Sequence, residues 1–240
     1  MMKDSFEKPA GHPGGHPGGH PGGHPGGRKP AHDLGPDVPE CRLIAWEITR
    51  SCNLACKHCR AEAHLEPYPG ELSTDEALAL IDTFPKVGKP IVIFTGGEPL
   101  LRKDVFTLVR HAKSRGLRPV MAPNGTLVTA ENARQMKEAG IERCSISIDG
   151  PDAASHDAFR CVPGAFEGSM RGIQFLKDAG IEFQINTTVT RNNLGQFKDI
   201  FSLAEKLGAA AWHIFLLVPT GRGAGLADQV ITAQEYEDVL

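Results

Sequence analysis

Short apolar runs alternate with amphipathic stretches from Arg42 onward, and this alternation limits the possible folds more than any other feature. Runs typical of buried strands cover residues 43–48, 91–95, 118–122, 143–148, 183–189 and 212–218. Helical patterns cover residues 73–84, 104–115, 129–140, 166–179, 197–207 and the stretch from 232 onward. Strand–helix units with short connections predict an α/β fold with a parallel sheet and right-handed crossovers. Six such units, rather than eight, predict a partial (β/α)6 barrel that is open on one side.

Local signals mark the ends of several of these helices. Ser73 and Glu76 form a capping box at the start of the first helix, and Thr232 and Glu235 form one at the start of the last. Pro85 should end the first helix, because proline has no N–H group to donate within a helix.

Three cysteines stand close together directly after the first strand. Cys52, Cys56 and Cys59 form a Cys-x3-Cys-x2-Cys motif in the segment CNLACKHC. Three thiolates on one loop can hold three irons of a 4Fe-4S cluster and leave the fourth iron open for a ligand. A structural zinc site completed by His58 or His64 is the alternative. Zinc modules usually combine two short ligand couples, however, and no second couple follows here.

A second motif follows the second strand, which ends in Gly96-Gly97-Glu98-Pro99. Two glycines allow a ligand to approach the backbone closely, and the carboxylate of Glu98 suits an ammonium group. Turns or loops with polar or glycine residues also follow the other strands, at residues 124–125, 149–150, 190–191 and 219–222. All six connections should therefore face one cavity, since parallel strands end at the same edge.

The composition is that of a reduced, globular protein. A chain of 240 residues can bury a full core. A net charge of −3 and a pI of about 6.4 give no sign of a nucleic-acid-binding surface. No segment reads as a signal peptide or membrane span. Six cysteines, three of them on one loop, suit free thiols better than disulfides. We therefore expect a cytoplasmic, oxygen-sensitive protein.

Residues 1–40 differ from the remainder, residues 41–240, which we take as the folded domain. Gly-His-Pro-Gly occurs four times between Gly11 and Gly26. Such low-complexity sequence cannot bury apolar surface and predicts a disordered tail. Its histidines, at positions 12, 16, 20 and 24, could bind a transition metal or the iron of a porphyrin. Otherwise the tail is a solvated extension.

The motifs together resemble the radical S-adenosylmethionine (SAM) enzymes, and the resemblance rests on CNLACKHC and FTGGEPLLR at this separation. It implies a partial, TIM-like barrel, a 4Fe-4S cluster on the three cysteines, and SAM bound to the open iron. It implies that Glu98 contacts the SAM amino group, Ser147 the ribose and Arg160 the carboxylate. It also implies SAM contacts from His58, from the backbone of Gly96 and Gly97, and from the backbone near Leu217. His156 and Asp157 should fix the local turn rather than perform catalysis. No residue is assigned as catalytic.

The segment SISIDGPDAASHDAFR resembles the subgroup with a cluster-binding C-terminal region, the SPASM and twitch enzymes. Cys41, Cys144 and Cys161 are too scattered to form a second cluster motif. We therefore expect that the chain is truncated and that an auxiliary 4Fe-4S cluster belongs to a missing C-terminal domain.

At a finer level, the motifs PNGT, INTTVTRNN and FLLVPTGRG make the chain similar to the haem synthases of the sirohaem-dependent haem pathway. This resemblance implies oxidative decarboxylation of two propionates of iron-coproporphyrin III to vinyls. An electron donor such as flavodoxin or ferredoxin would then be a partner. Arg191 and Arg222 follow strands five and six and are candidate contacts for the substrate carboxylates.

Two other functions remain open at this point. The first is a radical SAM enzyme that modifies a ribosomal peptide or another tetrapyrrole. The second is a non-catalytic metal-binding or assembly module, which the histidine-rich tail and the apparent truncation would suit.

Overall fold

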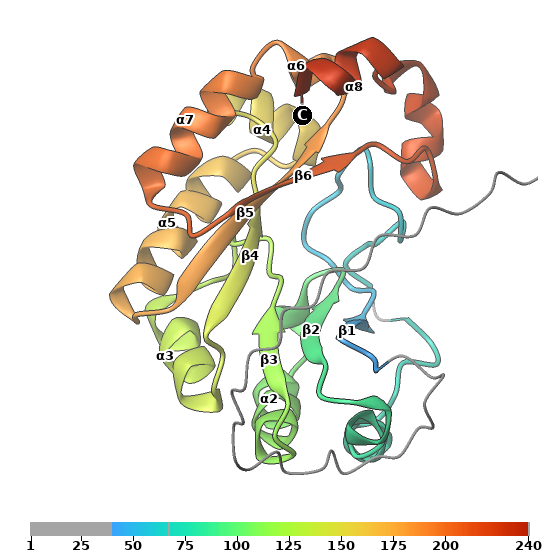
Figure 1. The fold of residues 1–240 in the computed structure, drawn as a ribbon, viewed down its shortest axis with the longest axis vertical. Helices are drawn as coiled ribbons and strands as arrows, with labels where there is room; N and C mark the ends of the chain where they lie inside the picture. The colour runs from blue at the N-terminus through green and yellow to red at the C-terminus, as the bar shows by residue number, and fades with distance from the viewer. Residues whose placement is uncertain (1–39, 67, 240) are drawn as a thin grey trace, which may run out of the picture. The chain divides into compact units, whose positions relative to one another are not determined.

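The computed structural model describes residues 40–66 and 68–239. Six parallel strands form one sheet in the order β1-β2-β3-β4-β5-β6 (Figure 1). The strands are β1 (Leu43–Thr49), β2 (Ile91–Gly96), β3 (Arg118–Met121), β4 (Arg143–Ser147), β5 (Glu182–Val189) and β6 (Trp212–Leu216). β1 and β6 are the two edge strands, so the sheet is the open, six-stranded partial barrel that the sequence predicts.

Helices connect the strands and cover the outer face of the sheet (Figure 1). The α-helices are α1 (Thr74–Ile81), α2 (Val105–Ser114), α3 (Ala130–Ala139), α4 (Ala153–Arg160), α5 (Ala165–Asp178), α6 (Arg191–Leu194), α7 (Phe197–Leu207) and α8 (Ala233–Val239). The 3-10 helices are η1 (Phe84–Val87), η2 (Pro99–Leu101) and η3 (Gly221–Gln229). No described helix has the length and apolar character needed to cross a membrane.

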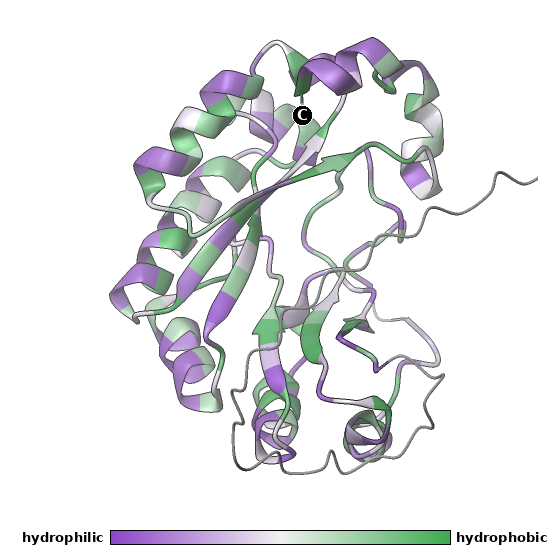
Figure 2. Ribbon diagram, in the orientation of Figure 1, coloured by the Kyte–Doolittle hydropathy of each residue, from purple (hydrophilic) through white to green (hydrophobic). Residues whose placement is uncertain are grey.

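The core lies between the sheet and the helices. Every second residue of a strand faces the helices and is buried there. In β2, Val92 and Phe94 are fully buried, while Ile91, Ile93 and Thr95 are partly exposed on the other face. The helices turn their hydrophobic sides toward the sheet and their hydrophilic sides outward (Figure 2). The helices therefore leave the inner face of the sheet open toward the connections at the carboxyl ends of the strands.

Most predicted elements are confirmed within one or two residues, and two differences have clear causes. α1 begins at the predicted capping box of Ser73 and Glu76 but ends at Ile81. Pro85 lies near the start of the following 3-10 helix, η1, where its missing N–H is tolerated. α4 was predicted only as a turn; Asp152 caps it through a hydrogen bond from the Ser155 N–H (2.8 Å).

The joint between β3 and β4 is the weakest in the sheet. Met121 and Cys144 are the one residue pair that joins these strands in the described part of the chain, whereas each of the other strand pairs shares a longer register. Helix α5 packs across this joint. The Ser169 hydroxyl of α5 donates to the Asn124 carbonyl oxygen (2.9 Å), and Gly172 lies directly against the Gly125 carbonyl.

We predicted that residues 1–40 are disordered. All of them except residue 40 lie outside the described residues. The division into a tail and a domain at residue 41 therefore stays a prediction.

Candidate functional site

The three cysteines of the predicted cluster motif lie on the loop that follows β1, and all three are free thiols. Cys52 and Cys56 are each 8% exposed, and Cys59 is half-buried. Backbone N–H groups two and four residues further on donate to the sulfurs of Cys52 and Cys59 (3.4 Å each). The sulfur of Cys56 accepts a hydrogen bond from Nη1 of Arg160 (3.5 Å). All three sulfurs thus accept a hydrogen bond.

These sulfurs fit the iron–sulfur cluster that the motif predicts. Burial raises the pKa of Cys52 to about 11, so this thiol keeps its proton at pH 7 unless a metal cation displaces it. The two histidines of the zinc alternative stack on aromatic rings, His58 on Phe159 and His64 on Tyr68. Within residues 40–66 and 68–239, no three His, Cys, Asp or Glu side chains gather closely enough to hold a single metal ion.

The turn at Gly96 and Gly97 packs directly on the cysteine loop. The Gly97 N–H donates to the Thr49 carbonyl (2.8 Å), and the Glu98 N–H donates to the Ser51 carbonyl (2.7 Å). A Cβ atom at either glycine would overlap these backbone atoms, and Gly96 has a positive φ of 144°. The glycines are therefore required for this close approach of two loops, a reason that is independent of any ligand.

Glu98 is buried below this turn and is 0% exposed. Its two carboxylate oxygens accept backbone N–H groups, from Leu100 (3.0 Å) and Asn124 (2.7 Å). Burial raises the pKa of Glu98 to about 7, although both hydrogen bonds act in the opposite direction. A nearby cation would favour the carboxylate form.

Arg160, at the end of α4, forms a buried ion pair with Asp149 and also contacts Cys56. The side chains of Arg160 and Asp149 are 9% and 0% exposed. The second carboxylate oxygen of Asp149 accepts the N–H of Thr188 (2.8 Å). The guanidinium thus joins the cluster loop to the end of β4, and only its Nε atom is buried without a hydrogen-bond partner.

His58 lies flat on Phe159 of α4, with 4.5 Å between ring centroids. The backbone of the neighbouring Lys57 donates to the Phe159 carbonyl (3.1 Å). Burial, together with the charge of Arg160, lowers the pKa of His58 to about 4, so its ring is neutral at pH 7. Its Nδ1 atom is buried without a partner.

The segment after β6 also reaches the cysteine loop. Arg222, in η3, donates from Nε to the Cys56 carbonyl (3.0 Å) and from Nη1 to the Ala63 carbonyl (2.6 Å). These bonds hold the loop, whereas the sequence suggested a substrate contact. Arg191 is exposed at the start of α6, and its Nη1 donates to the Asp228 carbonyl (3.3 Å).

The two remaining predicted residues lie near the ends of their strands. Ser147 is the half-buried last residue of β4. Leu217 follows β6, is 6% exposed, and its N–H donates to the Val189 carbonyl (3.3 Å). Near β4, His156 accepts the N–H of Asp149 on Nδ1 (3.2 Å), and Asp157 accepts two N–H groups at the start of α5. These last two residues fix the local structure, as predicted.

Sequence reasoning missed a polar network that links the cysteine loop to the connection after β3. Asn53 donates to the Thr126 hydroxyl and accepts from Nδ2 of Asn124 (2.8 Å each). Asn53 lies inside the recognised motif, but nothing in its spacing identifies a partner 71 residues away. The partner of Arg160, Asp149, was likewise recognised only as part of a turn.

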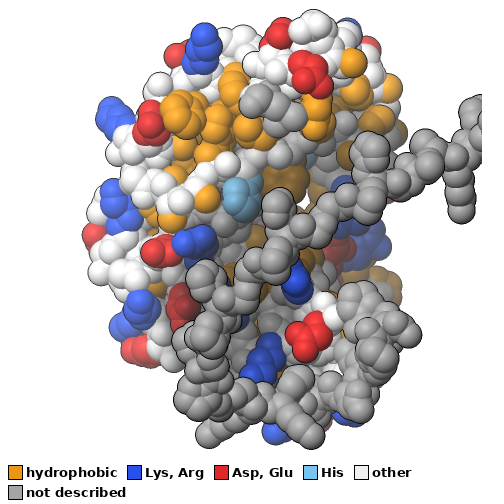
Figure 3. Space-filling view, in the orientation of Figure 1, with side chains coloured by type: hydrophobic (Ala, Val, Ile, Leu, Met, Phe, Trp, Pro, Cys, Tyr) orange, Lys and Arg blue, Asp and Glu red, His pale blue; other side chains and the backbone are white. Residues whose placement is uncertain are grey.

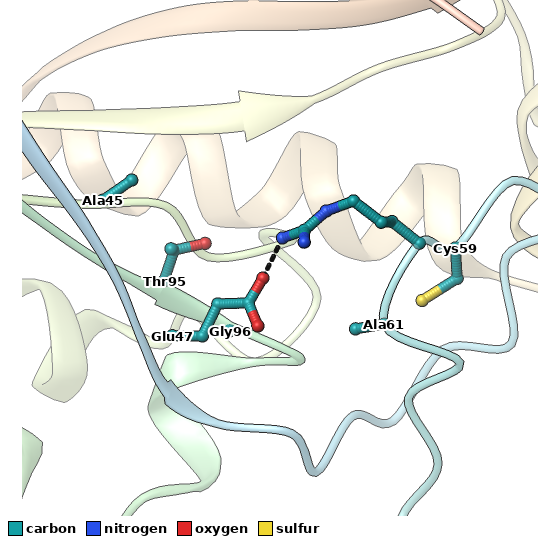
Figure 4. A pocket seen from close by; sticks show the side chains of 7 residues that line it. Ala45, Glu47, Cys59, Ala61, Thr95 and Gly96 are labelled. Carbon is teal, nitrogen blue, oxygen red and sulfur yellow. Dashed lines mark hydrogen bonds and ion pairs between the residues drawn. The ribbon is translucent and has the colours of Figure 1, made fainter. Parts of the chain in front are cut away.

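A cavity of about 530 Å³ opens on the inner face of β1 and β2 beside the cysteine loop. Figure 4 shows Glu47 and Thr95 on one side of it and Cys59 on the other. Arg60, the residue after Cys59, forms an ion pair with Glu47 across the cavity. The cavity thus joins a cysteine of the motif to the lumen of the barrel.

The structure is a parallel partial barrel with three free thiols on the loop after its first strand, beside a cavity. A model of the Radical SAM superfamily matches residues 46–204, and the chain belongs to that superfamily. Membership supports SAM and a 4Fe-4S cluster as cofactors.

Two relatives are close in sequence. The "AdoMet-dependent heme synthase" of Nitratidesulfovibrio vulgaris is 75% identical over 202 residues, which are 84% of this chain and 55% of the relative. The protein of the same name from Methanosarcina barkeri is 51% identical over 83% of this chain and 56% of its own length. The chain thus spans a little more than half the length of these curated relatives.

Solved structures agree on the fold. The structure of "Native anSMEcpe with bound AdoMet and Cp18Cys peptide" has a TM-score of 0.69 and 19% sequence identity. The match covers 84% of this chain and 58% of that one. At this identity the likeness establishes the radical SAM fold and nothing finer.

Proposed function

We propose that this chain is the radical SAM core of a haem synthase that oxidatively decarboxylates two propionates of iron-coproporphyrin III to vinyls, forming protohaem. The observation that carries the proposal is the loop of Cys52, Cys56 and Cys59 packed against Glu98 at the carboxyl ends of a parallel partial barrel. The 75% identity to a relative named AdoMet-dependent heme synthase supports the choice of substrate.

A 4Fe-4S cluster on the three cysteines would supply the electron that cleaves SAM into methionine and a 5′-deoxyadenosyl radical. We propose that Glu98 binds the SAM ammonium group, because a buried carboxylate gains from an adjacent cation. Arg160 would bind the SAM carboxylate through Nε, its buried nitrogen without a hydrogen-bond partner. The other proposed SAM contacts are the residues His58, Gly96, Gly97, Ser147 and Leu217.

The proposed reaction repeats at each of two propionates. The 5′-deoxyadenosyl radical would take a hydrogen atom from the carbon next to the porphyrin ring and become 5′-deoxyadenosine. The bond to the carboxylate carbon would then break, and carbon dioxide would depart. One electron is left over and the side chain becomes a vinyl group. We propose an auxiliary 4Fe-4S cluster, in a C-terminal region beyond Leu240, as its acceptor, and flavodoxin or ferredoxin as the donor to the first cluster.

Two arginines are proposed to meet the substrate carboxylates. Arg191 is exposed, whereas Arg222 would contribute only through Nη2, which is buried without a partner. We infer that the reaction takes place in the cytoplasm, because the six cysteines of the described chain are all free thiols.

The test begins with anaerobic reconstitution of the chain. We expect about four irons and four sulfides per chain, and cleavage of SAM on reduction. Changing Cys52, Cys56 or Cys59 to Ala should abolish both, whereas Cys161→Ala, at an exposed cysteine, should change neither. Stoichiometric zinc without iron–sulfur absorbance would refute the cluster.

The substrate is tested with the chain extended to the length of its relatives, SAM and a strong reductant. Iron-coproporphyrin III should lose two carbon dioxide molecules and four hydrogens, counted from the free acid, through a monovinyl species. If SAM is cleaved and the porphyrin stays intact while a peptide is modified, the chain is a peptide maturase instead. The peptide-bound structural neighbour favours that second function through the fold alone.

A further inference from the structure

The inner face of β5 and β6 carries a polar cluster that none of the proposed contacts uses. In β5, Phe183 and Ile185 are buried against the helices, so Gln184 and Asn186 face the other way, into the barrel. In β6, Trp212 packs on two phenylalanines of α7, with ring centroids 4.6 and 5.5 Å away. The next residue, His213, therefore points to the inner face.

Register brings these inner residues together. Asn186 pairs with Ser147 of β4 on one side and with His213 of β6 on the other. The Gln184 side-chain Nε2 lies 3.1 Å from Oδ1 of Asn186 and 3.1 Å from Nδ1 of His213. The amide of Gln184 thus holds both neighbours, directly beside a residue proposed to contact the SAM ribose.

The direction of these bonds decides what the cluster can bind. Nε2 of Gln184 is only a donor, so Nδ1 of His213 accepts and the imidazole proton sits on Nε2. Oδ1 of Asn186 also accepts, which turns its NH2 group away from Gln184. The cluster therefore presents N–H donors, from Asn186 and His213, and these suit an anion such as a carboxylate.

The surroundings add an apolar surface to these donors. Phe215 lies two residues beyond His213 on the same face of β6 and is 50% exposed. Val218, beyond the end of β6, is also exposed, and Figure 3 shows hydrophobic side chains gathered in this part of the molecule. At the opposite end of β5, the carboxylate of Glu182 is already paired with Arg143. An exposed aromatic ring beside N–H donors suits a flat apolar ring system that carries acidic side chains.

We propose that Asn186 and His213, held by Gln184, form a carboxylate-binding subsite for a propionate of the substrate, with Phe215 against the macrocycle. The subsite rests on the proposed function and assigns to it residues beyond Arg191 and Arg222. It lies on the same inner face as Ser147, so a propionate held there stays close to the proposed SAM ribose site.

Binding of three porphyrins to the reconstituted chain, extended to the length of its relatives, tests this subsite. The probes are metal-free coproporphyrin III, iron-coproporphyrin III and metal-free coproporphyrin III tetramethyl ester, which has no carboxylate. His213→Phe should raise the Kd of both free acids about tenfold or more, because a hydrogen bond to a charged group is lost. The same variant should leave the Kd of the ester unchanged. His213→Gln keeps an N–H donor and should restore most of the affinity.

Controls separate this role from misfolding. SAM affinity should be unchanged in His213→Phe, and His111→Phe, at a surface histidine paired with Asp82, should bind all three porphyrins as the unmodified chain does. Equal weakening of the ester would show a packing role and overturn the subsite. Weakening confined to the iron porphyrin would make His213 an iron ligand and overturn it as well.

The remaining outcomes distinguish this subsite from the function on which it rests. If the unmodified chain binds the free acids and His213→Phe binds them equally well, the subsite is wrong and the proposed function stands. If the extended chain without substitutions binds neither free acid, the proposed function fails and the subsite fails with it.

Discussion

Glu98 combines complete burial with a pKa of about 7, well above its ordinary value of 4.5. Between these two values the folded chain holds a proton that the unfolded chain has released, so folding stability must fall as pH rises. Binding of a cation beside this carboxylate would reverse that loss. A residue that destabilises the ligand-free protein is therefore the one proposed to meet the ammonium group of SAM.

We expect Glu98→Gln to remove this pH dependence from the iron-free chain. Relative to the variant, the unmodified chain should lose about 3 kcal/mol between pH 4.5 and 7, measured by urea unfolding at several pH values. His58 and His156, whose pKa values burial lowers to about 4, make stability rise with pH from about 4 to 6.5. That contribution is common to both proteins and cancels in the difference. Parallel stability curves would contradict the assignment.

Removing only one partner of the ion pair between Arg160 and Asp149 should lower the free energy of unfolding strongly. Arg160→Ala leaves a buried carboxylate without its partner, and we expect a loss of about 3–5 kcal/mol in urea unfolding. Adding Asp149→Asn should recover part of it, because the unpaired charge is removed. Arg134→Ala, at an exposed arginine paired with Glu131 and Glu138, should change the free energy of unfolding far less, because water screens that pair. Equal effects of the two single variants would show that the Arg160 pair is solvated.

At the scale of elements, helix α5 depends on small residues where it crosses the joint between β3 and β4. A Cβ atom at Gly172 would overlap the carbonyl oxygen of Gly125, and backbone cannot move aside easily. Gly172→Ala should therefore destabilise the fold by about 1–3 kcal/mol, although alanine favours helices. Gly195→Ala, where nothing lies within 4 Å and φ is −64°, should be neutral or slightly stabilising. Urea midpoints that move equally would contradict this packing.

The strands and most helices could be predicted because apolar periodicity and capping residues are local signals. Helix α4 was not predicted because its segment is short. Its polar residues His156 and Asp157 accept hydrogen bonds from backbone N–H groups outside the helix, so they were interpreted as parts of a turn. The cysteine loop was also predictable from spacing. The partners of Arg160 and Arg222 were not, since a single sequence does not reveal which distant carboxylate or carbonyl an arginine meets. Their placement depends on how the loops pack at the carboxyl ends of the strands.

At the scale of the whole molecule, the cysteine loop is bonded to α4, to η3 and to the turn after β2. Loading it with iron and SAM should therefore stabilise the entire fold. SAM at a hundredfold excess over its Kd should add about 2.7 kcal/mol to the reconstituted protein, seen as a rise in Tm under anaerobic conditions. The Cys52→Ala chain should show no such rise, and an equal shift in both would place SAM away from the cluster.

The single residue pair between β3 and β4 divides the barrel wall into two leaves, β1 to β3 and β4 to β6. The cysteine loop belongs to the first leaf, while Asp149, Arg160 and His213 belong to the second. Amide protons beside Met121 and Cys144 should exchange with deuterium before those at the centres of the other strand pairs. The hydrogen bond from Arg160 to Cys56 ties the leaves at one end, so iron loading should slow this exchange. If the barrel wall opens locally, this line should therefore open first, while the contact of Ser169 in α5 with Asn124 still bridges its outer side.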